Sequence, residues 1–209
     1  MSKLVFLGHA SFLMKAKDHS IVVDPYRDNS VPNMKFPRLE EVDAVFCSHD
    51  HYDHDARRKV AIKKNPLPIN PLTIRVPHDH EGGKKRGMND IRMFDIDGYK
   101  VAHLGDTGCV LDEKTLEPIK GCDVLLAPIN GYFTINPKEL KELCDIVKPR
   151  IVVPMHYYMK EFDSGYPDEN MFECFTKIFP DYQSIDNEEL DLDEYKDYKG
   201  ALVFKKYLN

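Results

Sequence analysis

One six-residue segment constrains this chain more than any other. His49, His51, Asp53 and His54 form the pattern His-x-His-x-Asp-His directly after an apolar run at 42–47 that predicts a buried strand. Imidazole and carboxylate are ligands that suit Zn²⁺, Fe²⁺ and Mn²⁺. In an extended stretch, side chains two residues apart project to the same side, so the first two histidines can hold one ion and the last two residues can face another. Four ligands are too many for one crowded ion, so the segment predicts two metals.

A solvated polar loop, in which the histidines only form hydrogen bonds, is the competing interpretation of this segment. It is disfavoured because such a dense combination arises rarely by chance in a chain of this composition. Three further candidate ligands follow predicted strands: His78, Asp106 and His156. Loops at strand ends gather at one edge of a sheet. His80 competes with His78, because residues two apart in a strand share a side, and Asp106 also fits a turn in Gly-Asp-Thr-Gly.

The remaining pattern predicts many short strands with a few helices, which indicates layered α/β sheets. We expect one hairpin between 3–7 and 20–23 with its turn at 15–19, and another between 91–95 and 100–104 around Asp97-Gly98. Asn136 is a predicted N-cap for a helix at 137–147. We expect further strands at 72–76, 124–128, 151–153 and 201–205. We expect further helices at 113–120 and 169–178. The acidic stretch 186–197 is predicted to be a solvated loop. No linker divides the chain, so we expect a single domain over 1–209.

Composition excludes several classes of protein. No apolar run approaches the ~20 residues that span a bilayer, and the net charge of −6 argues against a protein that grips a phosphate backbone. The five cysteines contain no CxxC pair and indicate reduced, packed thiols, Cys47 and Cys109 included. The N-terminus does not resemble a signal peptide, which favours a cytoplasmic protein. We expect a small-molecule substrate and no nucleic-acid partner, and a homo-oligomer is compatible with the sequence.

Taken together, the motifs resemble the metallo-β-lactamase superfamily, within the branch of ascorbate-phosphate lactonase-like and N-acylphosphatidylethanolamine phospholipase D-like hydrolases. The resemblance covers roughly residues 3–160. It rests on Gly8-His9-Ala10-Ser11, Val23-Asp24-Pro25, the His-x-His-x-Asp-His loop, His78-Asp79 with Gly83 and Arg86-Gly87, His103-Leu104-Gly105-Asp106, and Pro154-Met155-His156. It implies an αββα four-layer sandwich with a two-metal site at the edge where the sheets meet.

The resemblance also implies a ligand set. His49, His51 and His78 would bind the first metal, Asp53, His54 and His156 the second, and Asp106 would bridge both. It favours His78 over His80 and places Asp24 beneath the loop as a support for the ligands. His9 and His103 are expected to be structural residues or supports of the ligands. Between His54 and His78 this chain is shorter than its relatives, which place an additional helix and strand there.

The implied activity is hydrolysis of a small lactone, ester or phosphodiester by metal-bound hydroxide, with two divalent ions, Zn²⁺ first and Mn²⁺ or Fe²⁺ as alternatives. Asp53 would also orient the water or collect its proton. Lys84, Lys85 and Arg86 either favour an anionic substrate or are solvated turn residues. An iron-dependent redox enzyme on the same fold and a non-catalytic metal-binding protein are the alternatives. The first is disfavoured because diiron flavoprotein relatives carry an acidic residue where this chain has His51, and the second because no ligand position is missing.

Overall fold

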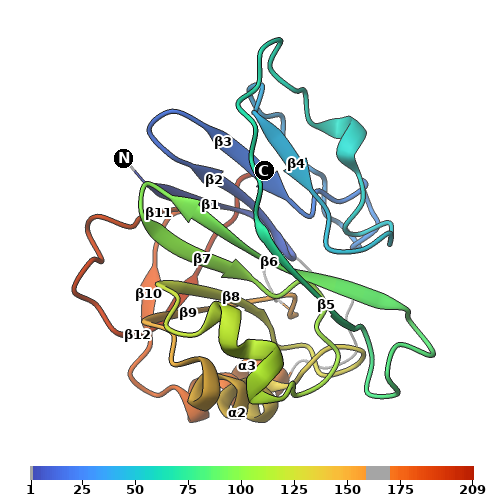
Figure 1. The fold of residues 1–209 in the computed structure, drawn as a ribbon, viewed down its shortest axis with the longest axis vertical. Coiled ribbons are helices and arrows are strands. Elements are labelled where there is room, and N and C mark those ends of the chain that lie inside the picture. The colour runs from blue at the N-terminus through green and yellow to red at the C-terminus, as the bar shows by residue number, and fades with distance from the viewer. Residues whose placement is uncertain (1, 159–169) are drawn as a thin grey trace.

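The computed structural model describes residues 2–158 and 170–209. Two β-sheets lie face to face, and the helices lie beneath the second sheet (Figure 1). The sequence prediction of layered α/β sheets is therefore confirmed. No helix in the described ranges is both long and apolar enough to cross a bilayer. Residue 169, where the last predicted helix begins, lies outside the described residues.

The first sheet has the order β11-β1-β2-β3-β4. Its strands are β1 (Lys3–Gly8), β2 (Ser11–Lys15), β3 (Ser20–Val23), β4 (Ala44–Phe46) and β11 (Glu189–Asp191). Two predictions are wrong here. The turn before Ser20 joins β2 to β3, so β1 is not the partner in that hairpin, because 11–15 forms a buried strand between them. Within the expected acidic loop, Leu190 is buried and β11 pairs antiparallel with β1.

The second sheet has the order β10-β12-β9-β8-β7-β6-β5. Its strands are β5 (Leu72–Pro77), β6 (Met88–Ile96), β7 (Tyr99–His103), β8 (Val124–Pro128), β9 (Ile151–Met155), β10 (Gln183–Ile185) and β12 (Gly200–Phe204). The predicted hairpin around Asp97-Gly98 is confirmed. Both turn residues have positive φ, 53° and 91°, which a type I′ turn requires.

Both faces of the second sheet are buried, because successive residues of its strands point to opposite sides. Leu126 and Val153 pack between the two sheets, whereas Leu125 and Val152 pack against the helices. The helices are α1 (Glu113–Leu116), which continues into the 3₁₀ turn η2 (Glu117–Ile119), α2 (Pro137–Val147) and α3 (Asn170–Ile178). The predicted N-cap of α2 is confirmed: Asn136 and Glu139 form a reciprocal capping box.

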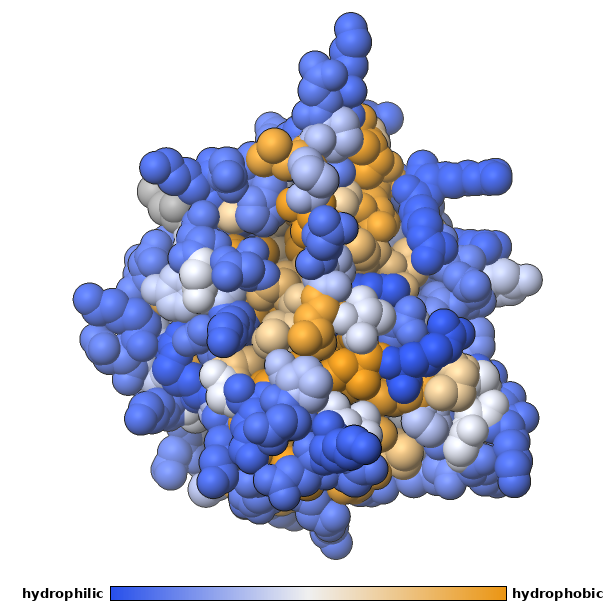
Figure 2. Space-filling view, viewed as in Figure 1, coloured by the Kyte–Doolittle hydropathy of each residue, from blue (hydrophilic) through white to orange (hydrophobic). Residues whose placement is uncertain are grey.

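The crossing from β4 to β5 contains most of the stretch between His54 and His78 that the resemblance marks as short. Among the described residues its only helical turn is η1 (Arg57–Lys59), so the outer face of the first sheet has no full helical layer. Prolines at 66, 68 and 71 prevent a helix here. The segment exposes Ile62, Leu67 and Leu72, and Figure 2 shows apolar surface on the face that this crossing spans.

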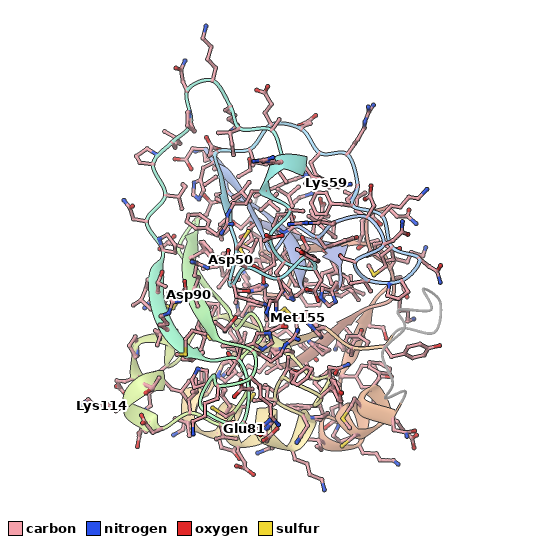
Figure 3. The ribbon with its side chains drawn as sticks, turned by 90° about the vertical axis from the view of Figure 1, so that its right-hand side faces the viewer. Asp50, Lys59, Glu81, Asp90, Lys114 and Met155 are labelled. Atoms are coloured by element: carbon pink, nitrogen blue, oxygen red, sulfur yellow. The ribbon has the colours of Figure 1, made fainter. Side chains whose placement is uncertain are left out.

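Strands of both sheets end at one edge of the molecule. In Figure 3, Asp50 of the loop after β4 and Met155 at the end of β9 are labelled near the middle of the view, one from each sheet. The loops after β1, β5 and β7 reach the same edge: His9 and His78 contact Asp53 and His51 after β4, and Asp106 contacts His156 after β9.

Candidate metal centre

Asp106 lies at the centre of the histidine cluster. Its Oδ2 atom is 3.3 Å from His54 Nε2, 3.4 Å from His78 Nε2 and 3.2 Å from His156 Nε2. His49 Nε2 is 3.9 Å from the same oxygen. Histidines from three different loops, attached to both sheets, therefore meet at one carboxylate.

The potential ligands fall into two groups on either side of this carboxylate. One group holds His49, His51 and His78; the other holds His9, Asp53, His54 and His156; within each group one ligand atom per residue lies within 4.8 Å of the others. His49 and His54 also group with Asp106, which connects the two sets. The structure thus brings together all seven residues that the sequence and its resemblance selected, and it adds His9 to them.

His9 is the residue that the sequence predicts to be structural or to support the ligands without binding metal itself. It follows β1 with a φ of 58°, and its buried Nε2 lies 3.3 Å from Asp53 Oδ2. Its carbonyl accepts a hydrogen bond of 2.9 Å from the His156 amide, which ties the ends of β1 and β9 together. Burial and the neighbouring His156 lower the pKa of His9 to about 4, so its neutral ring can donate to Asp53. Its signal in the sequence was its position directly after a strand.

Asp24 supports the ligands from below, as the resemblance implied. Its fully buried carboxylate accepts hydrogen bonds from the Ser48 amide and hydroxyl, both at 2.6 Å, and from His54 Nδ1 at 2.9 Å. The last contact fixes the ring so that Nε2 of His54 points at Asp106. Burial alone would raise the pKa of Asp24, but the hydrogen bond from His54 and the charge of nearby histidines lower it to about 2.

The donor set fits divalent metal ions. Nitrogens bound at 2.0–2.1 Å to a tetrahedral Zn²⁺ lie about 3.3–3.4 Å apart, and His51 Nδ1 is 3.2 Å from His78 Nε2. His49 Nε2, His54 Nε2 and Asp106 Oδ1 are buried and form no hydrogen bond within the described part of the chain. Buried polar atoms normally have partners, so these atoms are arranged for a ligand.

The carboxylates of the cluster also favour the binding of a cation. Burial would lower the pKa of His54, but the carboxylates of Asp106 and Asp53 raise it well above its ordinary value. Burial would raise the pKa of Asp53, and His54 and the hydrogen bond from His9 hold it well below its usual range. Both carboxylates are therefore ionised at neutral pH, which favours a cation between these side chains.

The loop after β5 separates the two candidate histidines. His78 is buried at the cluster, whereas His80 donates a 2.8 Å hydrogen bond to Glu139 of α2. Between them, the buried Asp79 carboxylate accepts hydrogen bonds from the backbone amides of Glu81, Gly83, Lys85 and Arg86 at 2.8–2.9 Å. Asp79 therefore sets the course of the loop that follows the ligand.

The thiols near the cluster are not poised for nucleophilic attack. Burial raises the pKa of Cys47 to about 12, and burial also raises the pKa of Cys109. Both residues are therefore thiols and not thiolates at neutral pH. This agrees with the expectation of packed cysteines.

A cleft of about 470 Å³ opens beside the cluster. Its lining residues are Ser30, Asp50, His51, Tyr52, Asp53 and Arg86. Asp53 has a quarter of its side chain exposed and so connects the buried cluster to the cleft. Two other cavities within the described residues, of about 580 and 480 Å³, are lined by none of the cluster residues.

Comparison with known proteins agrees with this geometry. The sequence profile of the beta-lactamase superfamily domain matches residues 3–156. A UPF0173 protein of Pyrococcus abyssi is 33% identical, with 74% of this chain and 83% of the relative covered. A UPF0173 metal-dependent hydrolase of Aeropyrum pernix is 27% identical, with 86% and 92% covered. Among solved structures, a Thermotoga maritima protein assigned to the Zn-dependent hydrolases of the metallo-β-lactamase superfamily has 29% identity and a TM-score of 0.71, with 98% of each chain covered.

Proposed function

Because this chain belongs to the beta-lactamase superfamily and is a metal-dependent hydrolase, we propose that two divalent cations occupy its histidine cluster, with Zn²⁺ as the preferred metal. The proposed reaction is hydrolysis of a small lactone, ester or phosphodiester. The observation that carries the proposal is the position of Asp106 Oδ2, which lies 3.2–3.4 Å from histidines of both ligand groups. A carboxylate shared in this way is suited to bridge two ions.

The proposed ligands are His49, His51 and His78 for one ion and Asp53, His54 and His156 for the other, with Asp106 between them. When bound, such a pair of ions supplies Lewis acidity that lowers the pKa of a water and polarises the carbonyl or phosphoryl group of the substrate. No serine or cysteine nucleophile is then needed, in keeping with the protonated thiol of Cys47.

Asp53 has a second proposed role in proton transfer. Its carboxylate faces both the cluster and the cleft, and its low pKa keeps it ionised, so Oδ2 can accept a hydrogen bond that orients the attacking water. As the group nearest that water it would also collect the proton. His9 Nε2 lies 3.3 Å from that oxygen and restricts the rotation of the carboxylate. Asp53 is therefore proposed as a catalytic residue, and His9 as its positioning residue.

The first experiment measures metal content and hydrolysis together. We expect about two Zn²⁺ or Mn²⁺ per chain after anaerobic purification, and chelator-sensitive turnover of at least one of bis(4-nitrophenyl) phosphate, a lactone panel and a thioester panel. Air-sensitive iron in place of these metals would favour the redox alternative. Full metal occupancy without turnover of any substrate would favour a binding protein.

Asp53→Ala tests the catalytic assignment. We expect at least a hundredfold loss of kcat, with metal content reduced toward one ion per chain. Asp18→Ala is the matched control, because Asp18 is an exposed carboxylate in the β2–β3 turn. Unchanged metal content and unchanged turnover in Asp53→Ala would remove Asp53 from both roles.

A further inference from the structure

The loop after His78 carries an arginine at the border of the cleft. The Arg86 guanidinium lies over the Phe133 ring at 4.6 Å from its centroid, and its Nη2 is 3.5 Å from His51 Nδ1. Phe133 belongs to the connection between β8 and α2, so this stacking joins two loops on the rim. One face of the planar guanidinium is covered by the ring, while its N–H groups radiate in the plane and remain able to bind an oxyanion.

The backbone also fixes this arginine. The Arg86 amide donates a 2.8 Å hydrogen bond to Asp79, the buried carboxylate that follows His78 directly. Gly83 closes the loop with a φ of 83°, and a Cβ there would lie 2.7 Å from the Gly87 carbonyl oxygen. The position of Arg86 is thus coupled to that of a metal-ligand candidate through one side chain, and its binding geometry is set before a substrate arrives.

The basic residues around the cleft differ in their partners. Arg57 lies 3.5 Å from Asp50, Arg27 pairs with Asp55 at 3.2 Å, and Lys85 pairs with Glu81. Arg86 forms no ion pair with any carboxylate in the ranges 2–158 and 170–209. Of the three basic residues 84–86, it is the one that lines the cleft.

Placing the Arg86 cation beside the metal centre costs electrostatic free energy, and a bound anion would offset that cost. The guanidinium lies beside His51, a proposed ligand of a divalent ion, so it adds positive charge next to a centre that itself collects cations. From these contacts we propose that Arg86 is the anion-binding residue of the substrate site, taking a carboxylate or phosphate group that is separate from the scissile bond. This inference rests on the proposed hydrolase function and adds to it the charge and placement of one substrate group.

The test compares esters that differ in one remote anion. The substrates are 4-nitrophenyl butyrate, the mono-4-nitrophenyl ester of succinate, and the 4-nitrophenyl ester of 3-phosphonopropionate, each with metal-loaded enzyme. We expect the wild type to favour the anionic esters about tenfold in kcat/KM, the effect of one charge-assisted interaction. Comparing the carboxylate and the phosphonate identifies which oxyanion the subsite prefers.

Arg86→Met should abolish this preference through KM, with a larger loss of kcat/KM for the anionic esters than for the neutral ester. Lys84→Met removes the same charge two residues away and should leave all three substrates unchanged. Arg86→Lys keeps the charge without the planar fork and should retain part of the preference. A preference that survives in Arg86→Met, or an equal loss for neutral and anionic esters, would overturn the proposal.

Equilibrium binding provides a readout that needs no turnover. Succinanilic acid, the amide analogue of the succinate ester, is titrated calorimetrically into the metal-loaded protein. We expect Kd to rise about tenfold in Arg86→Met and not in Lys84→Met, and to rise with ionic strength in the wild type. If the wild type binds the analogue through Arg86 but hydrolyses no ester, the proposed reaction fails and the anion site stands; if Arg86→Met binds equally well, the anion site fails.

Discussion

At the scale of single residues, buried carboxylates orient the ligand histidines. Asp24 has no exposed surface, and it accepts hydrogen bonds from His54 and from both donors of Ser48. Ser48 in turn contacts His49 Nδ1 at 2.9 Å. One carboxylate therefore orients a histidine of each proposed metal group.

Asp24→Asn should weaken metal binding. An amide cannot accept all three hydrogen bonds, and its NH₂ group would face other donors. We expect a 10–100-fold loss in affinity for at least one ion and a matching loss of activity at limiting metal. Competition with a coloured chelator measures the affinity, and Asp18→Asn, on the exposed turn, serves as the control. An unchanged affinity would show that Asp24 does not orient the ligands.

The ionised carboxylate of Asp43 stabilises the folded chain at a place away from the metal centre. Its carboxylate accepts hydrogen bonds from the Ser20 and Leu67 amides and pairs with Lys63 at 2.7 Å. Burial alone would raise the pKa of Asp43, but these contacts lower it to about 2 from 3.8. Because the pKa is lower in the folded chain, the contribution of Asp43 to the free energy of unfolding is present above pH 3.8 and is lost as the pH falls through about 2.

Asp43→Asn tests that linkage. At pH 5 the substitution should lower the free energy of unfolding, and the difference from wild type should shrink between pH 4 and pH 2. Urea unfolding of metal-free protein at several pH values measures it. A difference that stays constant across this range would mean that the ionised form of Asp43 is not the stabilising one.

At the scale of elements, two loops interlock to place their ligands. Gly108, in the loop after β7, packs so closely on the loop after β5 that a Cβ would lie 2.0 Å from the Asp79 amide nitrogen. Its own amide donates a 3.0 Å hydrogen bond to the Pro77 carbonyl. This backbone contact between the two loops therefore fixes the position of Asp106 relative to His78.

Gly108→Ala should separate these loops. Because the clash is with backbone, a side-chain rotation cannot relieve it, and we expect a large fall in metal content and in activity. Gly82→Ala adds the same methyl group in open space on the loop after β5, and its φ of 71° adds backbone strain that Gly108→Ala lacks, so a larger effect at Gly108 comes from the clash. Equal effects of the two substitutions on metal content would contradict the interlock.

At the scale of the whole molecule, the proposed ligands connect the two sheets. His49 and His54 follow β4 of the first sheet, whereas His78, Asp106 and His156 follow strands of the second. An ion bound between them stabilises the folded chain, because the unfolded chain does not hold these groups together. Bound metal should therefore stabilise the packing of one sheet on the other.

Metal removal should lower the melting temperature. At a free metal concentration of about a thousand times Kd, binding contributes about 4 kcal/mol, which corresponds to about 10 °C for a domain of this size. Calorimetry with and without chelator measures the shift. His156→Ala should show a smaller shift than wild type, and an equal shift in the two proteins would exclude His156 as a ligand.

Local sequence determined the residues that carry the chemistry and the turns that present them. The His-x-His-x-Asp-His spacing, the Asp97-Gly98 turn and the Asn136 cap depend on neighbours a few residues away, so they could be predicted from the chain alone. The strand at 11–15 was missed because a fully buried strand lacks the alternation that marks a half-buried one. The edge strands β10 and β11 are three residues long, and remote partners decide whether such segments pair.

Only the tertiary structure decided which side chains meet. His78 and His80 are equivalent in spacing, and it is the path of one loop over α2 that turns His80 to Glu139. His9 contacts Asp53, 44 residues further along the chain, and Arg86 contacts Phe133, 47 residues further along. The sequence by itself therefore specified the donors and their local geometry, whereas the packing of two sheets specified the centre, because contacts between distant residues depend on strand order and register.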